Sequence, residues 1–394
     1  MPTPQMGRRR VLGLAAVAAA APSIALVPDL GNLAFGAPGR AAGRLTLRPD
    51  SDGITSALDV PIGHPTGRAM TNGPVRSAVM GTSEFSALGV TWASGKGKVR
   101  VRTRHVHGGW TEWRTLKPLH DLPDRNTEEA AATPHGTALA WVGRSDAVQV
   151  EIDGSQTAPV LSLIDPGETP TPKVPSFKGR AATPKTTDTG KKQLPVPPLF
   201  GRKDWHPNPK FMNGPIHRVS TVKQIHVHHS DNANDYTWDD VPAMLRAIYR
   251  YHTQTLGWAD IAYNFLVDKF GRIWTGRTGS VGKMARGAHT LGFNNTSVGV
   301  CAIGNYQTAQ SNDKIHRAIA RVAAWKLSHW DRNPKGMIWV TSTGSDKFRA
   351  GERAHLPVID GHRNTNDTDC PGQHLYAHLN TIRGHTAHRM GTVK

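Results

Sequence analysis

A stretch rich in proline, threonine and lysine constrains the fold more than any other feature, because it divides the chain into two regions. It covers residues 166–197 and reads PGETPTPKVPSFKGRAATPKTTDTGKKQLPVP. With few large apolar side chains, it cannot bury enough surface to fold alone, and its repeated prolines favour an extended, semi-stiff spacer. A chain of 394 residues is also longer than one ordinary domain. We therefore expect two domains joined by this linker.

The region before the linker, residues 44–165, is predicted to form a smaller, sandwich-like all-β domain. Short runs with β-branched and aromatic residues recur between Gly, Asp and Asn residues, among them FSALGVTWAS, KVRVRTRHV, TALAWVG and AVQVEID. His105 and His107 alternate on one of these predicted strands without a third ligand-type residue. We interpret them as surface residues, and we find no catalytic spacing in this region.

The region after the linker, residues 198–394, alternates strand and helix patterns, which predicts an α/β domain. The strand patterns are Ile225–His228, SVGVCAIGN and HLPVIDGH, with a hairpin in AYNFLVDKFGRIWTGR that turns near Gly271. The helix patterns are TWDDVPAMLRAIYRYHTQTLG, residues 312–330 and a last helix opened by Pro371. Thr237 is expected to cap the first helix, with Asp240 closing the capping box.

The N-terminus has the pattern of an export signal. In MGRRRVLGLAAVAAAAPSIA, three arginines precede a short apolar run, and the paired arginines followed by Val11 and Leu12 resemble a twin-arginine signal. We expect a secretion signal over residues 1–36, with Ala34 at the −3 position of the cleavage site. No later segment is apolar for long enough to predict a transmembrane helix. The predicted location is therefore secreted or in the cell wall.

The formal net charge of +18 favours contact with polyanions such as anionic wall polymers. A purely solubilising role of the charge stays open. We find no basic stripe interleaved with aromatic residues, no helix-turn-helix and no zinc-finger spacing, so no specific nucleic acid is predicted as a partner. The sequence makes no prediction of the oligomeric state.

Three residues of types that bind metal stand at the ends of predicted elements. His228 and His362 each end a strand, and Cys370 follows eight residues after His362, at the predicted start of a helix whose dipole would stabilise a thiolate. Two imidazoles and one thiolate suit Zn²⁺ with an open fourth position, which is the pattern of a catalytic site. Two alternatives stay open: His226 as a fourth ligand, and a disulfide between Cys370 and Cys301, the other cysteine of the chain.

Four motifs in the second region resemble, in the same order, those of the peptidoglycan recognition proteins and type 2 N-acetylmuramoyl-L-alanine amidases, and the N-terminal β-region resembles domains that precede this one in exported actinobacterial amidases. They are IHVHHSDN, GWADIAYNFLVDKFGRIWTGR, GAHTLGFNNTSVGVCAIGNY and GHRNTNDTDCPG, and GRKDWHP resembles the start of the domain. The resemblance covers residues 198–385. It implies a central mixed β-sheet flanked by helices.

The resemblance also implies the chemistry and the residues that carry it. The zinc ligands would be His228, His362 and Cys370, holding one catalytic Zn²⁺. A zinc-bound water would attack the amide that joins the lactyl group of N-acetylmuramic acid to L-alanine in peptidoglycan. Tyr263 would donate a hydrogen bond to the water or to the oxyanion, and Thr368 would donate one to the transition state without supplying a positive charge.

Three further residues match or lie near family positions at the groove that takes muramyl peptides. They are His289, Trp258 and Arg286, whose other interpretation is ordinary surface or packing. His229 and His252 are interpreted as structural. Family members that only recognise peptidoglycan commonly lack the cysteine ligand, so Cys370 favours catalysis.

Two alternatives to a freely active amidase stay open. One is a wall protein that binds peptidoglycan without hydrolysing it. The other is a dormant amidase whose groove is covered by the linker or by the β-domain.

Overall fold

The computed structural model describes residues 44–62, 74–178, 193–282 and 284–391. The predicted signal, residues 1–36, lies outside this part of the chain. The described residues form one compact unit. None of the described helices is long and apolar enough to cross a membrane.

The first region is built on a nine-stranded sheet, in which every pair between named strands is antiparallel. Its path runs β1-β2-β9-β4-β8-β5-β6, with β3 beside β8 and β7 beside β4. The strands are β1 (Arg48–Pro49), β2 (Ser56–Pro61), β3 (Val75–Arg76), β4 (Met80–Trp92), β5 (Gly97–His105), β6 (Arg114–Thr115), β7 (His135–Gly136), β8 (Ala140–Gly154) and β9 (Val160–Asp165). One short helix, α1 (Glu128–Ala132), interrupts them. The prediction of a smaller all-β domain is confirmed.

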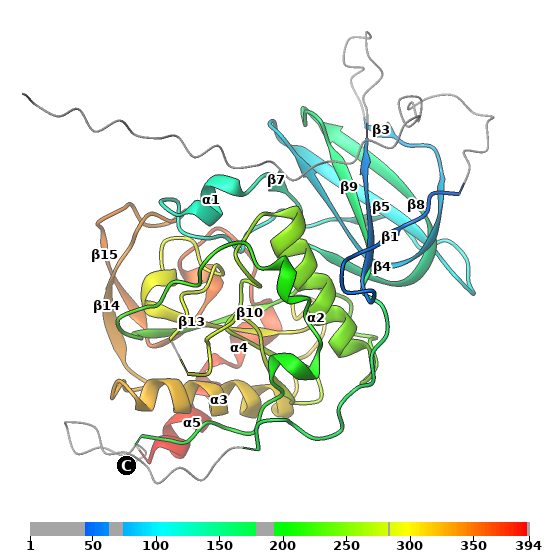
Figure 1. The fold of residues 1–394 in the computed structure, drawn as a ribbon. Coiled ribbons are helices and arrows are strands. Elements are labelled where there is room, and N and C mark those ends of the chain that lie inside the picture. The colour runs from blue at the N-terminus through cyan, green and yellow to red at the C-terminus, as the bar shows by residue number, and fades with distance from the viewer. Residues whose placement is uncertain (1–43, 63–73, 179–192, 283, 392–394) are drawn as a thin grey trace, which may run out of the picture. The chain divides into compact units, whose positions relative to one another are not determined.

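A five-stranded mixed sheet forms the centre of the second region (Figure 1). Its order is β12-β11-β13-β10-β16, with β10 (Gln224–His229) parallel to both β13 (Ser297–Ala302) and β16 (Ile359–Gly361). The hairpin of β11 (Phe265–Val267) and β12 (Ile273–Thr275) completes it, and β14 (Met337–Thr341) pairs separately with β15 (Arg353–Pro357). The predicted α/β domain is confirmed.

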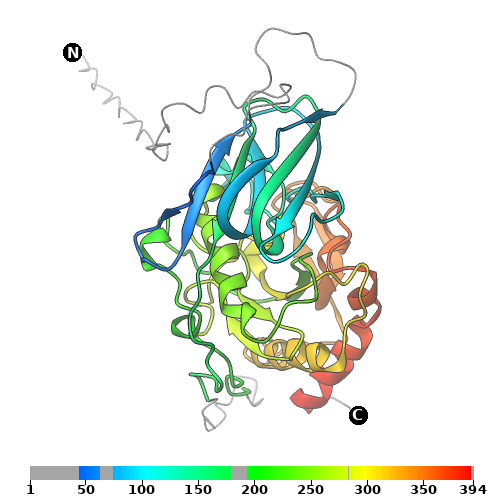
Figure 2. The ribbon, with the colours of Figure 1, turned by 90° about the vertical axis from the view of Figure 1, so that its right-hand side faces the viewer.

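Helices cover both faces of this sheet, as Figures 1 and 2 show. Apolar residues of β10 alternate with histidines, so Ile225 and Val227 enter the cluster that contains α3 (Asp313–Ser328) and α5 (Leu379–Met390). The opposite face includes Cys301 and packs with α2 (Asp240–Arg250). This second cluster also contains apolar side chains of the first region, such as Trp141. His226 and His228 therefore face the side where the two regions meet, whereas His229 points to the opposite face.

Three boundaries in the second region differ from the prediction. Helix α2 begins at Asp240, and the carboxylate of Asp240 accepts hydrogen bonds from both the backbone N–H and the hydroxyl of Thr237, so Thr237 does not cap the helix through its oxygen. HLPVIDGH divides into β15 and β16, which belong to different sheets. The last helical segment begins at Gln373 with α4 (Gln373–Ala377), after Pro371 and Gly372.

The described ends of the proline-rich stretch contact the folded regions instead of standing free. The guanidinium of Arg246 on α2 donates hydrogen bonds to the carbonyl oxygens of Pro166 and Gly167. Phe177 and Leu199 exchange two backbone hydrogen bonds. Backbone groups of Pro166, Gly167 and Phe177 therefore find partners in the folded regions.

A buried lysine on α3 gives the fold a testable pH dependence. Lys326 donates to the carbonyl oxygen of Ser280 at 2.5 Å, and burial lowers its pKa from 10.5 to about 7. Between these values the unfolded chain binds one more proton than the folded chain, so stability rises with pH and the penalty is complete below pH 7. Lys326→Met should therefore stabilise the protein by on the order of 2–4 kcal/mol more at pH 6 than at pH 10. Urea unfolding at both pH values measures this, and an equal effect at both would contradict it.

Candidate metal centre

Two strands and the loop after β16 bring His228, His362 and Cys370 together. One ligand atom from each lies within 4.8 Å of the other two. The Cys370 Sγ atom is 3.6 Å from His228 Nδ1, and both histidines are fully buried, with Cys370 6% exposed. Parallel pairing of β10 with β16 explains the convergence, because the carboxyl ends of parallel strands meet at one edge of the sheet.

A fourth group, Asp121, comes from the first region. It lies between β6 and α1, and its Oδ1 atom is 3.0 Å from His228 Nδ1 and 3.5 Å from His362 Nδ1. Sequence reasoning missed this residue and assigned no catalytic pattern to the β-domain. The surrounding letters KPLHDLPDRN carry no spacing that signals a ligand.

The donor set fits a tetrahedral zinc ion. Among the described residues, neither Asp121 Oδ1 nor His362 Nδ1 makes a well-formed hydrogen bond, although both atoms are buried and close to one another. Zinc bonds of about 2.0–2.3 Å place ligand atoms roughly 3.3–3.6 Å apart in a tetrahedron. The 3.6 Å from Cys370 Sγ to His228 Nδ1 and the 3.5 Å from Asp121 Oδ1 to His362 Nδ1 match this spacing, whereas Asp121 Oδ1 and His228 Nδ1 are closer, at 3.0 Å. Unpaired buried polar atoms are costly, and a cation between them would satisfy all of them.

His289 and Thr290 orient the ring of His228 from behind. His228 Nε2 lies 3.2 Å from both His289 Nδ1 and Thr290 Oγ1, which leaves Nδ1 directed at Asp121 and Cys370. Fixing one ring nitrogen in this way sets the tautomer and the ring plane of a metal-binding histidine.

Burial shapes the protonation of the other two ligands. It lowers the pKa of His362 well below its ordinary value and raises the pKa of the Cys370 thiol well above it. A bound cation would reverse the effect at the thiol, because it stabilises the thiolate directly. The helix dipole expected to do this is displaced, because α4 begins at Gln373. The backbone N–H of His229 points at the sulfur instead, at 3.4 Å.

Tyr263 and Thr368, the two residues predicted to assist catalysis, both lie at the centre. The Tyr263 hydroxyl donates to Asp121 Oδ2 at 2.6 Å, and burial is the main cause that raises its pKa well above the ordinary value. Thr368 Oγ1 accepts from the backbone N–H of Cys370 at 3.2 Å and is half-buried. Asp121 thus bridges the metal-binding atoms and the tyrosine.

The three residues predicted to line a groove differ in their surroundings. His289 is fully buried behind His228, and Trp258 is fully buried with its indole N–H donating to Thr133 Oγ1 of the first region. Arg286 is half-buried, and its guanidinium reaches Asn295 at 3.4 Å. Trp258 therefore packs against the β-domain, although the sequence predicted that it would contact the substrate.

The remaining residues that the sequence left open have structural surroundings. Both cysteines are free, so the alternative disulfide is absent from the described structure. His229 Nδ1 accepts from the backbone N–H of Tyr306, and His252 Nδ1 accepts from that of Ala262, in agreement with structural roles. His226 is buried and is not among the residues grouped at the centre.

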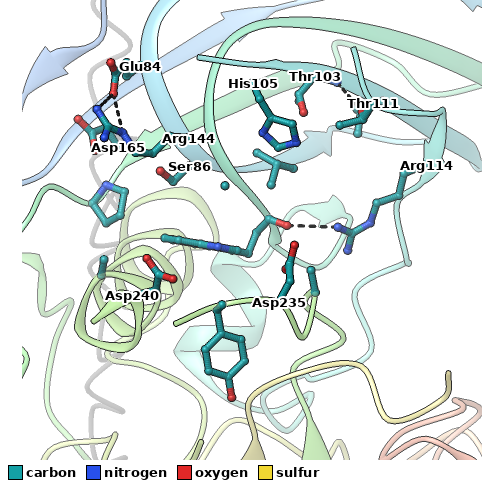
Figure 3. A pocket seen from close by; sticks show the side chains of 18 of the residues that line it. Glu84, Ser86, Thr103, His105, Thr111, Arg114, Arg144, Asp165, Asp235 and Asp240 are labelled. Atoms are coloured by element: carbon teal, nitrogen blue, oxygen red, sulfur yellow. Dashed lines mark hydrogen bonds and ion pairs between the residues drawn. The ribbon is translucent and has the colours of Figure 1, made fainter. Parts of the chain in front are cut away.

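A small pocket reaches this centre. A pocket of about 70 Å³ is lined by Asp121, Thr368 and Cys370 together with nearby residues such as Lys117 and His229. A larger pocket of about 830 Å³ lies elsewhere and contains none of the predicted site residues. Figure 3 shows its charged lining, in which Glu84 pairs with Arg144 at 2.7 Å and Arg114 donates to the carbonyl oxygen of Trp141.

Both regions of the chain match known protein families. Residues 50–185 match the family described as Rv3811 N-terminal galactose-binding domain-like, and residues 218–373 match the N-acetylmuramoyl-L-alanine amidase family. Peptidoglycan-recognition protein SC1a of Drosophila melanogaster is 30% identical over 159 residues, which are 40% of this chain and 70% of that protein.

Two further relatives extend the comparison. The N-acetylmuramoyl-L-alanine amidase of Homo sapiens is 30% identical over 192 residues, 48% of this chain and 28% of that protein. Among solved structures, wild-type Drosophila PGRP-LB is 25% identical with a TM-score of 0.36, over 46% of this chain and 92% of that chain. The match to the recognition protein covers 70% of that protein at 30% identity, and the sequence motifs agree with it. The chain therefore belongs to the family of peptidoglycan-recognition proteins and N-acetylmuramoyl-L-alanine amidases.

Proposed function

We propose that the protein is an exported, zinc-dependent amidase that hydrolyses the bond between the lactyl group of N-acetylmuramic acid and L-alanine in peptidoglycan. The observation that carries this proposal is the convergence of His228, His362 and Cys370, whose ligand atoms lie within 4.8 Å of one another. Recognition proteins and amidases share the family, and the complete donor set favours the amidase.

The side chains around the centre have separate tasks in this reaction. When bound, Zn²⁺ lowers the pKa of a coordinated water and acts as a Lewis acid towards the carbonyl oxygen. Tyr263 holds a hydroxyl proton beside the ligand atoms, where it can donate to a developing oxyanion. Thr368 accepts from the backbone N–H of Cys370 and so helps to fix the position of the sulfur. The fully buried His289 keeps the His228 ring oriented.

Metal removal tests the proposal directly. The full chain and its Asp121→Ala variant are incubated with purified peptidoglycan, and mass spectrometry measures released stem peptides with a free L-alanine terminus. We expect release that stops after treatment with a chelator and returns when Zn²⁺ is added back. If neither protein releases stem peptides in the presence of zinc, the amidase proposal is wrong.

A second candidate function is peptidoglycan binding without hydrolysis. The match of residues 50–185 to a galactose-binding-like family, together with the net charge of +18, supports attachment to glycan or to anionic wall polymers. This function predicts that His228→Ala leaves pull-down on cell walls unchanged and that no stem peptides appear with any variant.

The proposed export rests on residues 8–21, which combine the arginines with an apolar run. Replacing Arg8 and Arg9 by lysine is expected to keep the precursor inside the cell, because twin-arginine signals are read through this pair. Immunoblots of the cell and culture fractions measure this, and unchanged secretion would rule out the twin-arginine route.

A further inference from the structure

The loop that carries Asp121 is fixed to the second region at several points. Asp124 Oδ1 accepts from the backbone N–H of Gly292 at 2.8 Å and from Asn294 Nδ2 at 3.1 Å. The same Asn294 amide donates to the carbonyl oxygen of Leu122. Residues 117–124, here called the plug loop, therefore lie across the metal centre, held by groups that flank the buried His289.

Contacts after the plug loop hold it from its other end. Glu129 on α1 accepts from the Arg277 guanidinium at 2.5 Å and from the backbone N–H of Ala259 at 3.0 Å. Breaking a buried ion pair of this kind is strongly unfavourable, because it leaves an uncompensated charge. The loop thus leaves the centre only when the β-domain itself shifts or when its anchors are broken.

We infer that Asp121 is the fourth ligand of the metal and that the full chain is a latent amidase, closed by its own N-terminal domain. One carboxylate oxygen lies 3.0 Å and 3.5 Å from the facing nitrogens of His228 and His362, and the other accepts a hydrogen bond from the Tyr263 hydroxyl at 2.6 Å. A single side chain therefore fills the metal position that water would take. The same side chain also binds the hydroxyl of Tyr263, the proposed donor to the oxyanion.

The net charge and the number of ligands at the zinc site explain why this arrangement leaves no position for water. Two imidazoles and one thiolate leave a zinc site with a net charge of +1, which the Asp121 carboxylate neutralises. Four protein ligands give the pattern of structural zinc sites, whereas catalytic sites keep one position for water. Asp121 also presents the chemical group that amide hydrolysis would leave on the lactyl moiety, a carboxylate, so it occupies the centre as a product would. This last point, and the activity test below, rest on the proposed function.

The test compares three full-length proteins, wild type, Asp121→Ala and the matched control Asp153→Ala, which changes an exposed aspartate on β8 of the same domain. Each is loaded with Co²⁺, and its visible spectrum is recorded while azide is added. We expect only Asp121→Ala to change its spectrum, because only this variant has a position that an external anion can fill. Zinc affinity, measured by chelator competition, should fall about 10²–10³-fold in this variant alone, the loss expected for one of four ligands.

Activity gives the second half of the test. Release of stem peptides should rise at least about tenfold in Asp121→Ala, because the competent state is no longer a small fraction of the population. A second variant, Asp124→Ala, loosens the plug loop while keeping Asp121, and should show an intermediate rate and azide response.

The outcomes separate the two proposals. If wild type responds to azide as Asp121→Ala does and binds zinc equally tightly, Asp121 is not a ligand and the inference is overturned. If the metal results appear as expected but no protein cleaves peptidoglycan, the ligand assignment stands and the proposed amidase function fails. If Asp121→Ala does not fold, an azide response and faster cleavage in Asp124→Ala support the plug, and their absence overturns it.

Discussion

Replacing His362 with alanine is expected to lower the affinity for zinc by about 10²–10³-fold and to reduce stem-peptide release to background. Zinc binding to four protein ligands is worth about 10–16 kcal/mol, so each ligand contributes roughly 2.5–4 kcal/mol. At 1.4 kcal/mol per factor of ten, this gives the stated loss. The fully buried His362 Nδ1 atom makes no hydrogen bond within the described part of the chain.

The measurement is chelator competition on the full chain, combined with product analysis in the Asp121→Ala background. His355→Ala is the matched control, because His355 is exposed on β15 and stacks on Trp339 away from the centre. An unchanged zinc affinity in His362→Ala would show that the ion, if bound, is held by other groups.

Tyr263→Phe, made in the Asp121→Ala background, is expected to slow amide cleavage by about 10²–10³-fold while leaving zinc affinity unchanged. Removing one donor to a developing oxyanion typically has this effect. The background matters, because in the unaltered chain the Tyr263 hydroxyl is bonded to Asp121. Phenylalanine keeps the ring that packs beside His228, with centroids 5.6 Å apart.

Steady-state rates on a soluble muramyl peptide measure this effect as a loss in kcat. Tyr376→Phe serves as the control, because Tyr376 is a half-buried tyrosine on α4. A rate equal to that of the background protein would remove Tyr263 from the mechanism and leave it as a packing residue.

The fold and the metal-binding trio were predictable because their signals are local. The strands of the sheet are short runs that contain apolar residues; His228 lies near the end of β10, and His362 directly follows β16. Parallel pairing of β10 with β16 then brings these two strand ends together. The family motif GHRNTNDTDCPG, which contains both His362 and Cys370, then assigned the cysteine to the same site.

Asp121 was not predictable, because its role depends on how the two regions pack. It meets Tyr263 across 142 positions of sequence, and the letters around it resemble an ordinary polar loop. Trp258 is a second residue whose surroundings depend on how the two regions pack. Its neighbours in the sequence suggested a groove, but Thr133 of the β-domain covers its indole nitrogen. A pattern within one domain does not report what the other domain places against it.

X-ray absorption at the zinc edge of the full-length protein tests the central claim most directly, because it reports the ligand atoms themselves. The account predicts one sulfur at about 2.3 Å and three nitrogen or oxygen atoms at about 2.0–2.2 Å. A zinc ion with no sulfur neighbour, or a protein that binds no zinc, would contradict it.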